Sequence, residues 1–441
     1  MNRRTLLKAF SAGTLGAAAQ LPARAQTALR GLPPLTIRDV RVILTAPNGI
    51  RLVVVKVETS EPGLYGLGCA TFTQRAFAVA TAVQEYLRPF LIGKDAGRIE
   101  DVWQSSFVSS YWRNGPVLNN AMSGVDMALW DIQGKRANMP VYQLLGGKCR
   151  ESADVYAHAS GRDFQEVADN VRKAMEQGYR YVRAQVAVPG QSTYGARGAG
   201  AAPAQPGQGA RPRAPWEPAA YVRLAPKLFE FLRAKLGEEV ELLHDVHERV
   251  TLPQAVRLCK DLEPYRLFFL EDPLPPEEID HFRIIRQQCS TPLAMGELFN
   301  NPHEFVPLIS NRLIDFIRIH ISQIGGLSPA RKVAALGEYF GVRTAWHGPG
   351  DVSPVGHAAN LALDLACYNF GIQECTGFGA NTREVFPGCP EIRDGAMWAG
   401  DAPGLGVDLD EKLAAKFPAP PVRGDDGWGS TRRRDGTVIR P

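Results

Sequence analysis

The feature that most constrains the fold is a series of short apolar segments in the second part of the chain. From residue 151 onward these segments alternate with helical patterns and end near His158, Gln185, Asp245, Glu271, Glu297, Ile319, His347 and Glu374. Eight strand–helix units are what a (β/α)8 barrel of the TIM type needs. An open, doubly wound sheet is the alternative, but no glycine-rich phosphate turn follows the first segment. We therefore predict an α/β fold with a barrel over residues 151–400.

A small α+β capping domain is predicted ahead of the barrel, over residues 34–150. Alternating apolar residues at 37–44, the turn Pro47-Asn48-Gly49 and a second apolar run at 52–57 predict a β-hairpin. Helical periodicity follows at 76–92, 97–108 and 117–137. The C-terminal segment 401–441 is expected to return to this domain.

An insertion at residues 195–215 interrupts the even spacing between the second and third barrel strands. It reads GARGAGAAPAQPGQGARPRAP, with no apolar periodicity. Such a composition buries too little surface to order itself, so a floppy loop is expected. Because loops that follow barrel strands form the catalytic face, a mobile lid is the functional alternative.

The first 25 residues have the three parts of an export signal. Residues 2–8, NRRTLLK, resemble the twin-arginine motif, a weakly apolar stretch covers 9–21, and Ala23-Arg24-Ala25 matches an A-x-A cleavage site. We expect export by the twin-arginine route and a periplasmic location. The sequence has no apolar run of about 18 residues or more, so we predict no transmembrane span.

Composition excludes little but sets useful limits. The formal net charge of +4 is small, and the basic residues are scattered, so no nucleic-acid partner is expected. The seven cysteines are odd in number and form no C-x-x-C pair, which is neither a disulfide framework nor a zinc-site spacing. We interpret them as mostly buried small apolar residues.

Three consecutive predicted strands each end in a carboxylate. These are Asp245, Glu271 and Glu297, separated by 26 residues in each case. Carboxylates that converge at the mouth of a barrel repel one another unless a cation holds them. Hard oxygen ligands in an open site suit Mg²⁺, which we predict as the cofactor. Further polar residues end other strands, namely His158, Arg183, Arg318, His320, His347 and Glu374.

Several dense motifs extend this pattern. They are Tyr111–Pro116, Val141–Gly147, Tyr156–Ala159, His244–Glu248, Glu297–Asn300, Trp346–Asp351 and Gln373-Glu374. Together they resemble the D-mannonate dehydratase family, in the mandelate racemase-like branch of the enolase superfamily. The resemblance implies Mg²⁺-dependent removal of a proton α to a carboxylate, followed by loss of the β-hydroxyl. The implied reaction converts D-mannonate to 2-keto-3-deoxy-D-gluconate, with D-gluconate or D-galactonate as alternative substrates.

The resemblance also implies roles for individual residues. The branch usually carries a Lys-x-Lys base where this chain has Arg183-Ala184-Gln185. Tyr194 is therefore the implied base, with Arg183 stabilising its phenolate, and His247 is the implied acid for the leaving hydroxyl. His347 is the alternative base. The implied substrate-binding residues are His158, Arg318, His347, Asp351 and Glu374, and either Asn48 or Arg51 takes a substrate-facing position in the N-terminal hairpin; we predict Asn48.

Other functions remain open at this point. Racemisation or cycloisomerisation is a second enolase-type reaction, but racemisation needs two bases, and the missing lysines at 183 and 185 count against it. A non-catalytic protein that binds or senses sugar acids is a third possibility, disfavoured by the complete set of acidic residues and His247. In each case a small sugar acid is the expected partner, and a homo-oligomer is expected.

Overall fold

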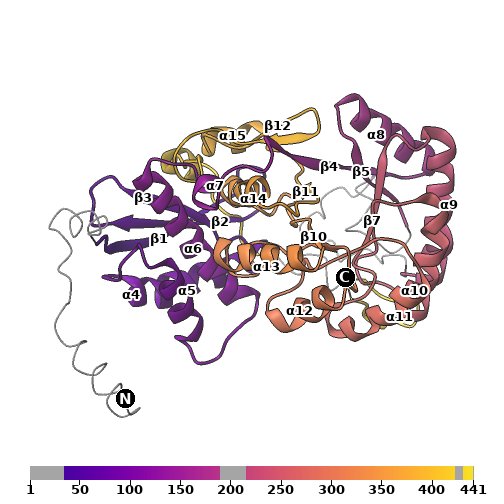
Figure 1. Ribbon diagram of the computed structural model, residues 1–441, viewed down its shortest axis with the longest axis horizontal. Helices are drawn as coiled ribbons and strands as arrows, with labels where there is room; N and C mark the ends of the chain where they lie inside the picture. The colour runs from indigo at the N-terminus through magenta and orange to yellow at the C-terminus, as the bar shows by residue number, and fades with distance from the viewer. Residues whose placement is uncertain (1–33, 189–214, 423–430, 441) are drawn as a thin grey trace, which may run out of the picture. The chain divides into compact units, whose positions relative to one another are not determined.

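The computed structural model describes residues 34–188, 215–422 and 431–440 (Figure 1). The predicted export signal, Tyr194 and all but the last residue of the insertion 195–215 lie outside these residues. From Thr36 onward the chain forms one compact unit. Among the described helices, none combines the length and the apolar character needed to span a membrane.

The N-terminal part begins with a three-stranded antiparallel sheet in the order β1-β2-β3. Its strands are β1 (Ile37–Thr45), β2 (Leu52–Thr59) and β3 (Tyr65–Cys69), so the predicted hairpin is confirmed. The long helix α6 (Pro116–Ala137) packs directly on β3. A Cβ atom at Gly68 would lie 1.9 Å from the carbonyl oxygen of Gly124 on α6, so only glycine permits this contact.

The other predicted helical segments of this part also form. They are α3 (Ala76–Thr81), the π-helical turn η2 (Ala82–Leu87), α4 (Arg88–Leu91), α5 (Ile99–Val108) and α7 (Val141–Leu144). The periodicity at 76–92 predicted one helix, and the structure has three consecutive segments, the middle of which is π-helical.

The second part is the predicted barrel. Its parallel strands are β4 (Ser152–Gly161), β5 (Tyr181–Val186), β6 (Glu241–Asp245), β7 (Phe269–Glu271), β8 (Leu293–Met295), β9 (Phe316–Ile317), β10 (Arg343–Thr344) and β11 (Gln373–Glu374). The sheet closes because β11 pairs with β4 and Thr344 of β10 bridges to Phe370. The α/β barrel fold is therefore confirmed.

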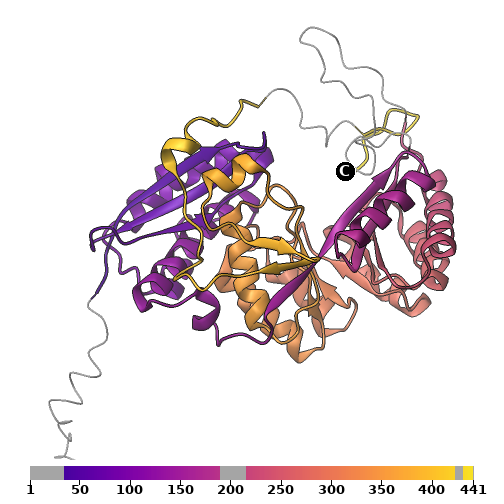
Figure 2. The same ribbon diagram turned by 90° about the horizontal axis from the view of Figure 1, so that it is seen from above.

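Helices follow the barrel strands in turn. They are α8 (Phe164–Glu176), α9 (Pro218–Leu236), α10 (Leu252–Leu262), α11 (Phe282–Gln288), α12 (Pro302–Ser310), α13 (Leu327–Tyr339) and α14 (Pro354–Ala366), with 3-10 turns η3 (Glu263–Tyr265) and η4 (Pro276–His281). Several begin at a side-chain cap: Asp163 accepts from the Glu166 amide at 2.9 Å, and Asn301 with Glu304 forms a capping box. Figure 2 shows α8 to α10 on the outer side of the strands that they connect.

The C-terminal residues add elements around the barrel. The hairpin β12 (Glu391–Arg393) and β13 (Ala396–Trp398) pairs with the first residues of β4, and α15 (Ala380–Val385) precedes it. Helix α16 (Glu411–Ala414) reaches the N-terminal sheet, where Glu411 pairs with Arg41 on β1 at 3.0 Å and with Lys56 on β2 at 2.7 Å.

Candidate active site

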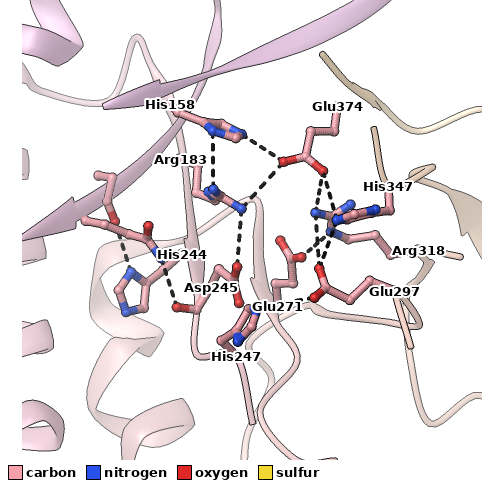
Figure 3. Close-up of polar contacts among 12 residues, drawn as sticks. His158, Arg183, His244, Asp245, His247, Glu271, Glu297, Arg318, His347 and Glu374 are labelled. Atoms are coloured by element: carbon pink, nitrogen blue, oxygen red, sulfur yellow. Dashed lines mark hydrogen bonds and ion pairs between the residues drawn. The ribbon is translucent and has the colours of Figure 1, made fainter. Parts of the chain in front are cut away.

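The carboxyl ends of the barrel strands bring a dense set of charged side chains together (Figure 3). They come from strand ends or the first residues of the following loops: His158, Arg183, Asp245, His247, Glu271, Glu297, Arg318, His347 and Glu374. Because parallel strands share one carboxyl edge, residues far apart in the sequence meet here. The structure therefore assembles every described residue of the predicted catalytic and metal-binding sets in one place.

Glu374 is the most fully engaged carboxylate of the site. Its Oε1 accepts from His158 at 2.8 Å and lies 3.6 Å from Arg183, while its Oε2 accepts from Arg318 at 2.7 Å and from the Gly348 amide at 3.1 Å. Burial alone would raise the pKa of Glu374, but the charge of Arg318 and the hydrogen bond from His158 hold it well below its usual value. This glutamate is a fixed anion.

Arg183 links two sides of the site. Its guanidinium lies 3.2 Å from Asp245 Oδ2 and 3.2 Å from His158 Nδ1, and Gln185 on the same strand donates to the Asp245 backbone carbonyl at 3.1 Å. Burial and the adjacent Arg183 charge lower the pKa of His158, which favours the neutral ring. The side chains at the two positions of the missing lysines therefore hold Asp245 in place.

The predicted metal ligands are deeply buried. Asp245 is 3%, Glu271 0% and Glu297 8% exposed. Glu271 forms an ion pair with Arg318, yet its Oε2 and the Oδ1 of Asp245 accept no hydrogen bond within the described part of the chain. Burial raises the pKa of Glu271 well above its usual value, against the opposing charge of Arg318. Buried carboxylate oxygens without donors are costly, and a divalent cation is a partner that would satisfy them.

Glu297 is positioned between two imidazoles. Its Oε1 lies 3.2 Å from His247 Nε2, and its Oε2 lies 3.2 Å from His347 Nε2. Burial would raise the pKa of Glu297, but the charges of His347 and His247 outweigh it and lower that pKa. Conversely, Glu297 raises the pKa of His247 although burial opposes the shift. His247 is thus able to carry a proton inside the site.

A metal-sized group of oxygens forms at Glu271, Asp272 and Glu297, whose nearest ligand atoms lie within 4.8 Å of one another. Asp245 is not in this group, and its Oδ2 lies 3.2 Å from Arg183. Six buried carboxyl groups occupy the region, those of Asp245, Glu248, Glu271, Asp272, Glu297 and Glu374, against the three guanidinium groups of Arg183, Arg249 and Arg318. A cation with two charges would offset most of the excess, and the oxygen donors are those that Mg²⁺ prefers.

A second group lies beyond the ends of the sixth and seventh barrel strands, β9 and β10. His320, His347 and Asp351 offer atoms within 4.8 Å of one another, and the rings of His320 and His347 are 5.2 Å apart. Burial lowers the pKa of His320 well below its usual value and raises the pKa of Asp351. Asp351 Oδ1 has no hydrogen-bond partner among the described residues. His347 and Asp351 therefore lie close together on this side without a direct hydrogen bond among the described residues.

Comparison with known proteins shows which family has this site. Residues 27–146 match the mandelate racemase/muconate lactonizing enzyme N-terminal domain, and residues 166–413 match the enolase C-terminal domain-like family. A D-galactonate dehydratase family member from Musicola paradisiaca is 57% identical over 92% of this chain and 99% of its own length. The chain belongs to the D-galactonate dehydratase family. A second member, from Pantoea ananatis, is also 57% identical over the same shares.

Solved structures agree with the fold and with the enolase superfamily. An enolase from Pantoea ananatis, solved with bound D-gluconate and Mg, has a TM-score of 0.87 and 57% identity, covering 92% of this chain and 100% of that one. A putative dehydratase from Zymomonas mobilis has a TM-score of 0.73 and 28% identity, covering 86% and 98%. The superfamily branch is therefore as the motifs indicated. The D-mannonate dehydratase family is not the one that these relatives name.

Two acidic residues near the site of this D-galactonate dehydratase family member were not predicted from the sequence. Asp272 directly follows the strand-end Glu271, and its left-handed φ of 42° turns it back toward the site, where it accepts from the Gly296 amide at 3.3 Å. Glu248 follows His247, both have a φ of 56°, and burial raises the pKa of Glu248 to about 7. The signal for both was an acidic residue directly after a predicted site residue, Glu271 in one case and His247 in the other.

Asn48 lines a cavity that contains none of the charged residues of the candidate site. It is exposed on the turn between β1 and β2, and this cavity of about 620 Å³ is also lined by Pro349 and Gly350, which precede Asp351. Arg51, the other candidate, donates to the Thr73 carbonyl at 3.0 Å. Of the two, Asn48 is the residue that borders this cavity.

Proposed function

We propose that this chain is a Mg²⁺-dependent hydro-lyase that dehydrates a sugar acid, with D-gluconate as the leading substrate and D-galactonate next. The observation that carries the proposal is the buried Glu271–Asp272–Glu297 group, with acceptor oxygens unsatisfied and imidazoles on two sides. The relative that holds D-gluconate and Mg supports this choice at 57% identity. D-mannonate, which the motifs first suggested, is retained as a third substrate to be tested.

We assign the cation to Glu271 and Glu297, completed by Asp245 as the spacing predicted or by Asp272 as the proximity of the oxygens suggests. A bound Mg²⁺ would offset the negative charge that develops on the substrate carboxylate as the α-proton leaves. Arg183 supports the site in either case, because its contact with Asp245 sets where that carboxylate points.

Side chains of the protein act as the general acid and the general base. His247, oriented by Glu297, donates a proton to the departing β-hydroxyl, which leaves as water, and the resulting enol becomes the 2-keto-3-deoxy acid. The base is Tyr194, as the family resemblance implies, or His347, which Glu297 orients from the other side. Racemisation is disfavoured, because the side chains in the usual lysine positions are occupied in holding Asp245.

The decisive experiment is turnover of the purified chain on D-gluconate, D-galactonate and D-mannonate with Mg²⁺, followed by detection of the 2-keto-3-deoxy acid. We expect product with at least one aldonate and its loss when the metal is chelated. Tight binding of an aldonate without turnover would favour the non-catalytic sugar-acid binding protein instead. Product formation that survives chelation of every divalent metal would exclude the proposed chemistry.

We further propose that the protein is exported by the twin-arginine route to the periplasm, on the support of the N-terminal Arg3-Arg4 motif and the Ala23-Arg24-Ala25 cleavage site. The double substitution Arg3→Lys, Arg4→Lys should leave the precursor folded in the cytoplasm. Processing of that variant in the periplasm at the wild-type level would exclude this route. We also propose that the chain forms a homo-oligomer, as the sequence analysis predicted. Light scattering of the purified chain tests this.

A further inference from the structure

Strands β5 and β6 stay in contact beyond the last residues that pair between them. The pairing of the two strands ends at Arg183 and Leu243. Just beyond it, the ring of His244 contacts the carbonyl oxygen of Ala184 at 2.9 Å. Gln185 donates at 3.1 Å to the backbone carbonyl of the last residue of β6. Side-chain hydrogen bonds to the backbone therefore take over where the strand pairing stops.

The hydrogen bonds of His244 determine which ring nitrogen carries the proton. A carbonyl oxygen can only accept, so Nδ1, which faces Ala184, carries a hydrogen. Nε2 lies 2.7 Å from the hydroxyl oxygen of Tyr221 on α9. Burial lowers the pKa of His244, which favours the neutral ring, and in that ring Nε2 accepts from the Tyr221 hydroxyl. The two hydrogen bonds thus run in one direction, from α9 through His244 to β5.

The packing around Tyr221 holds this arrangement in place. The ring of Tyr221 stacks on His244 with centroids 5.9 Å apart, and Phe229, also on α9, meets the same imidazole at 5.2 Å. Trp216, which is fully buried just before α9, lies 5.4 Å from Tyr221 and donates from Nε1 to the carbonyl of Arg249 at 3.3 Å. The His244 ring is therefore fixed by aromatic packing as well as by hydrogen bonds.

We propose that His244 and Tyr221 are positioning residues for the candidate active site. His244 and Asp245 are neighbours on β6, so their side chains point to opposite faces of the strand. Figure 3 shows Asp245 among the charged side chains and the His244 ring directed away from them. His244 and Tyr221 therefore act from behind the strand, and neither is a metal ligand or an acid–base group in the proposed mechanism.

The effect reaches the site through the end of β5. Ala184, whose carbonyl His244 holds, lies between Arg183 and Gln185, and both of these contact Asp245. A shift of the Ala184 carbonyl would therefore move both partners of Asp245. This inference rests on the proposed function, because it assigns these residues to the support of the proposed cation site.

Tyr221→Phe tests the role of the hydroxyl while the aromatic ring is kept. Residues that support a metal site typically contribute about 10–100-fold, so kcat should fall by at least about tenfold and Mg²⁺ affinity should weaken by about tenfold. The KM for the aldonate should change by less than about threefold, because the loss lies in positioning and not in substrate contacts. Tyr142→Phe is the matched control: it removes the hydroxyl of another buried tyrosine, which donates to Asp401 at 3.0 Å, and should keep wild-type values.

Two substitutions of His244 separate its two hydrogen bonds. His244→Asn keeps an N–H group near the place of Nδ1 and loses the acceptor for Tyr221. His244→Gln keeps an acceptor near the place of Nε2 and loses the donor to Ala184. Because the proposal assigns the effect to the Ala184 contact, His244→Asn should retain a kcat about tenfold higher than that of His244→Gln. A role in packing alone predicts no such order.

Nitrogen-15 NMR of the imidazole gives a readout that is independent of turnover. In the wild type we expect a neutral His244 with its hydrogen on Nδ1. Hydrogen on Nε2 instead, equal kcat in the two His244 variants, or wild-type kcat and Mg²⁺ affinity in folded Tyr221→Phe would each overturn the proposal. If Tyr221→Phe fails to fold, the His244 variants and the NMR result decide. A wild type that binds Mg²⁺ but turns over no aldonate would contradict the proposed function, and the Mg²⁺ affinities of the same variants would then decide the positioning role.

Discussion

Glu374 and Glu271 are two buried glutamates at the carboxyl ends of barrel strands, and both contact Arg318. They differ in how many of their oxygens accept hydrogen bonds and in the direction of their pKa shifts. Each oxygen of Glu374 has at least one hydrogen-bonding partner, whereas Glu271 Oε2 accepts no hydrogen bond in the described part of the chain. Correspondingly, the pKa of Glu374 is lowered and that of Glu271 is raised. The same residue type in the same architecture is a fixed anion in one case and an incompletely paired one in the other.

This difference distinguishes a carboxylate that holds other side chains in position, Glu374, from one that is available to bind a ligand, Glu271. A carboxylate whose oxygens are satisfied by protein donors holds other side chains in position, and here Glu374 orients His158 and Arg318. A buried carboxylate with an unsatisfied oxygen is costly unless a ligand completes it. Arg318 joins the two, because its Nε pairs with Glu271 and its Nη2 pairs with Glu374. Substitutions on the two sides should therefore have different consequences.

The largest effect is expected from Glu271→Gln. Removing the charge while keeping the shape takes one ligand from the proposed cation site, so kcat should fall by at least about 10³-fold at saturating substrate. Steady-state kinetics with Mg²⁺ measure this. Glu239→Gln, an exposed glutamate before β6, is the matched control and should retain wild-type activity. Activity of Glu271→Gln within tenfold of the wild type would contradict the role of Glu271.

Glu374→Gln should act mainly on stability. Arg318 and Arg183 each lose a partner for a buried charge, and breaking a buried ion pair in this way typically costs about 3–5 kcal/mol. Urea unfolding should show this loss as a lower midpoint at an unchanged slope. A variant that unfolds at the wild-type midpoint would mean that Glu374 is not the scaffold of the site.

His247→Asn tests the proposed proton donor, which contacts Glu297. Loss of a general acid typically costs about 10²–10⁴-fold, so dehydration should fall by at least about 10² while the base and metal ligands remain. The α-proton should therefore still exchange slowly with deuterium in the solvent. If exchange and dehydration are lost to the same extent, His247 does not act as the acid alone. Loss of exchange in His347→Asn but not in Tyr194→Phe would identify His347 as the base.

The smallest effect is expected far from the site, at Glu411. Its hydrogen bonds with Arg41 and Lys56 lower its pKa from the ordinary value of 4.5 to about 2. A lowered pKa adds stability that is present above pH 4.5 and lost as the pH falls toward 2. The pair is partly exposed, so Glu411→Gln should cost less than about 1 kcal/mol at pH 7. Melting curves at pH 7 and pH 3 should show that the difference from the wild type shrinks on acidification, and a difference that grows would contradict this ion-pair account.

The sequence predicted the fold well because the barrel repeats one pattern. An apolar strand that ends in a polar residue is a local signal, and it recurs at Asp245, Glu271 and Glu374, which are the last residues of their strands in the structure. Glu297 shows the limit of that signal. Strand β8 ends at Met295, and Glu297 lies two residues later in the turn, so the equal spacing of the three acids does not mean equal positions at their strand ends.

The parts that could not be predicted depend on contacts across the barrel. The ion pair of Arg318 with both Glu271 and Glu374 joins the strands β7, β9 and β11, and its existence follows from barrel closure and side-chain length. Asp272 reaches the site because its backbone is left-handed, and this conformation could not be predicted from its residue type. Tyr194, inferred only from resemblance, remains a prediction.

The measurement that tests the account most directly is calorimetric titration of Mg²⁺ into the wild type, Glu271→Gln and Glu374→Gln, each first shown to be folded. We predict a single Mg²⁺ site in the wild type, an affinity weaker by at least about 10²-fold in Glu271→Gln, and a change of less than about tenfold in Glu374→Gln. Unchanged Mg²⁺ affinity in Glu271→Gln would contradict the central claim that the incompletely paired carboxylates form the cation site.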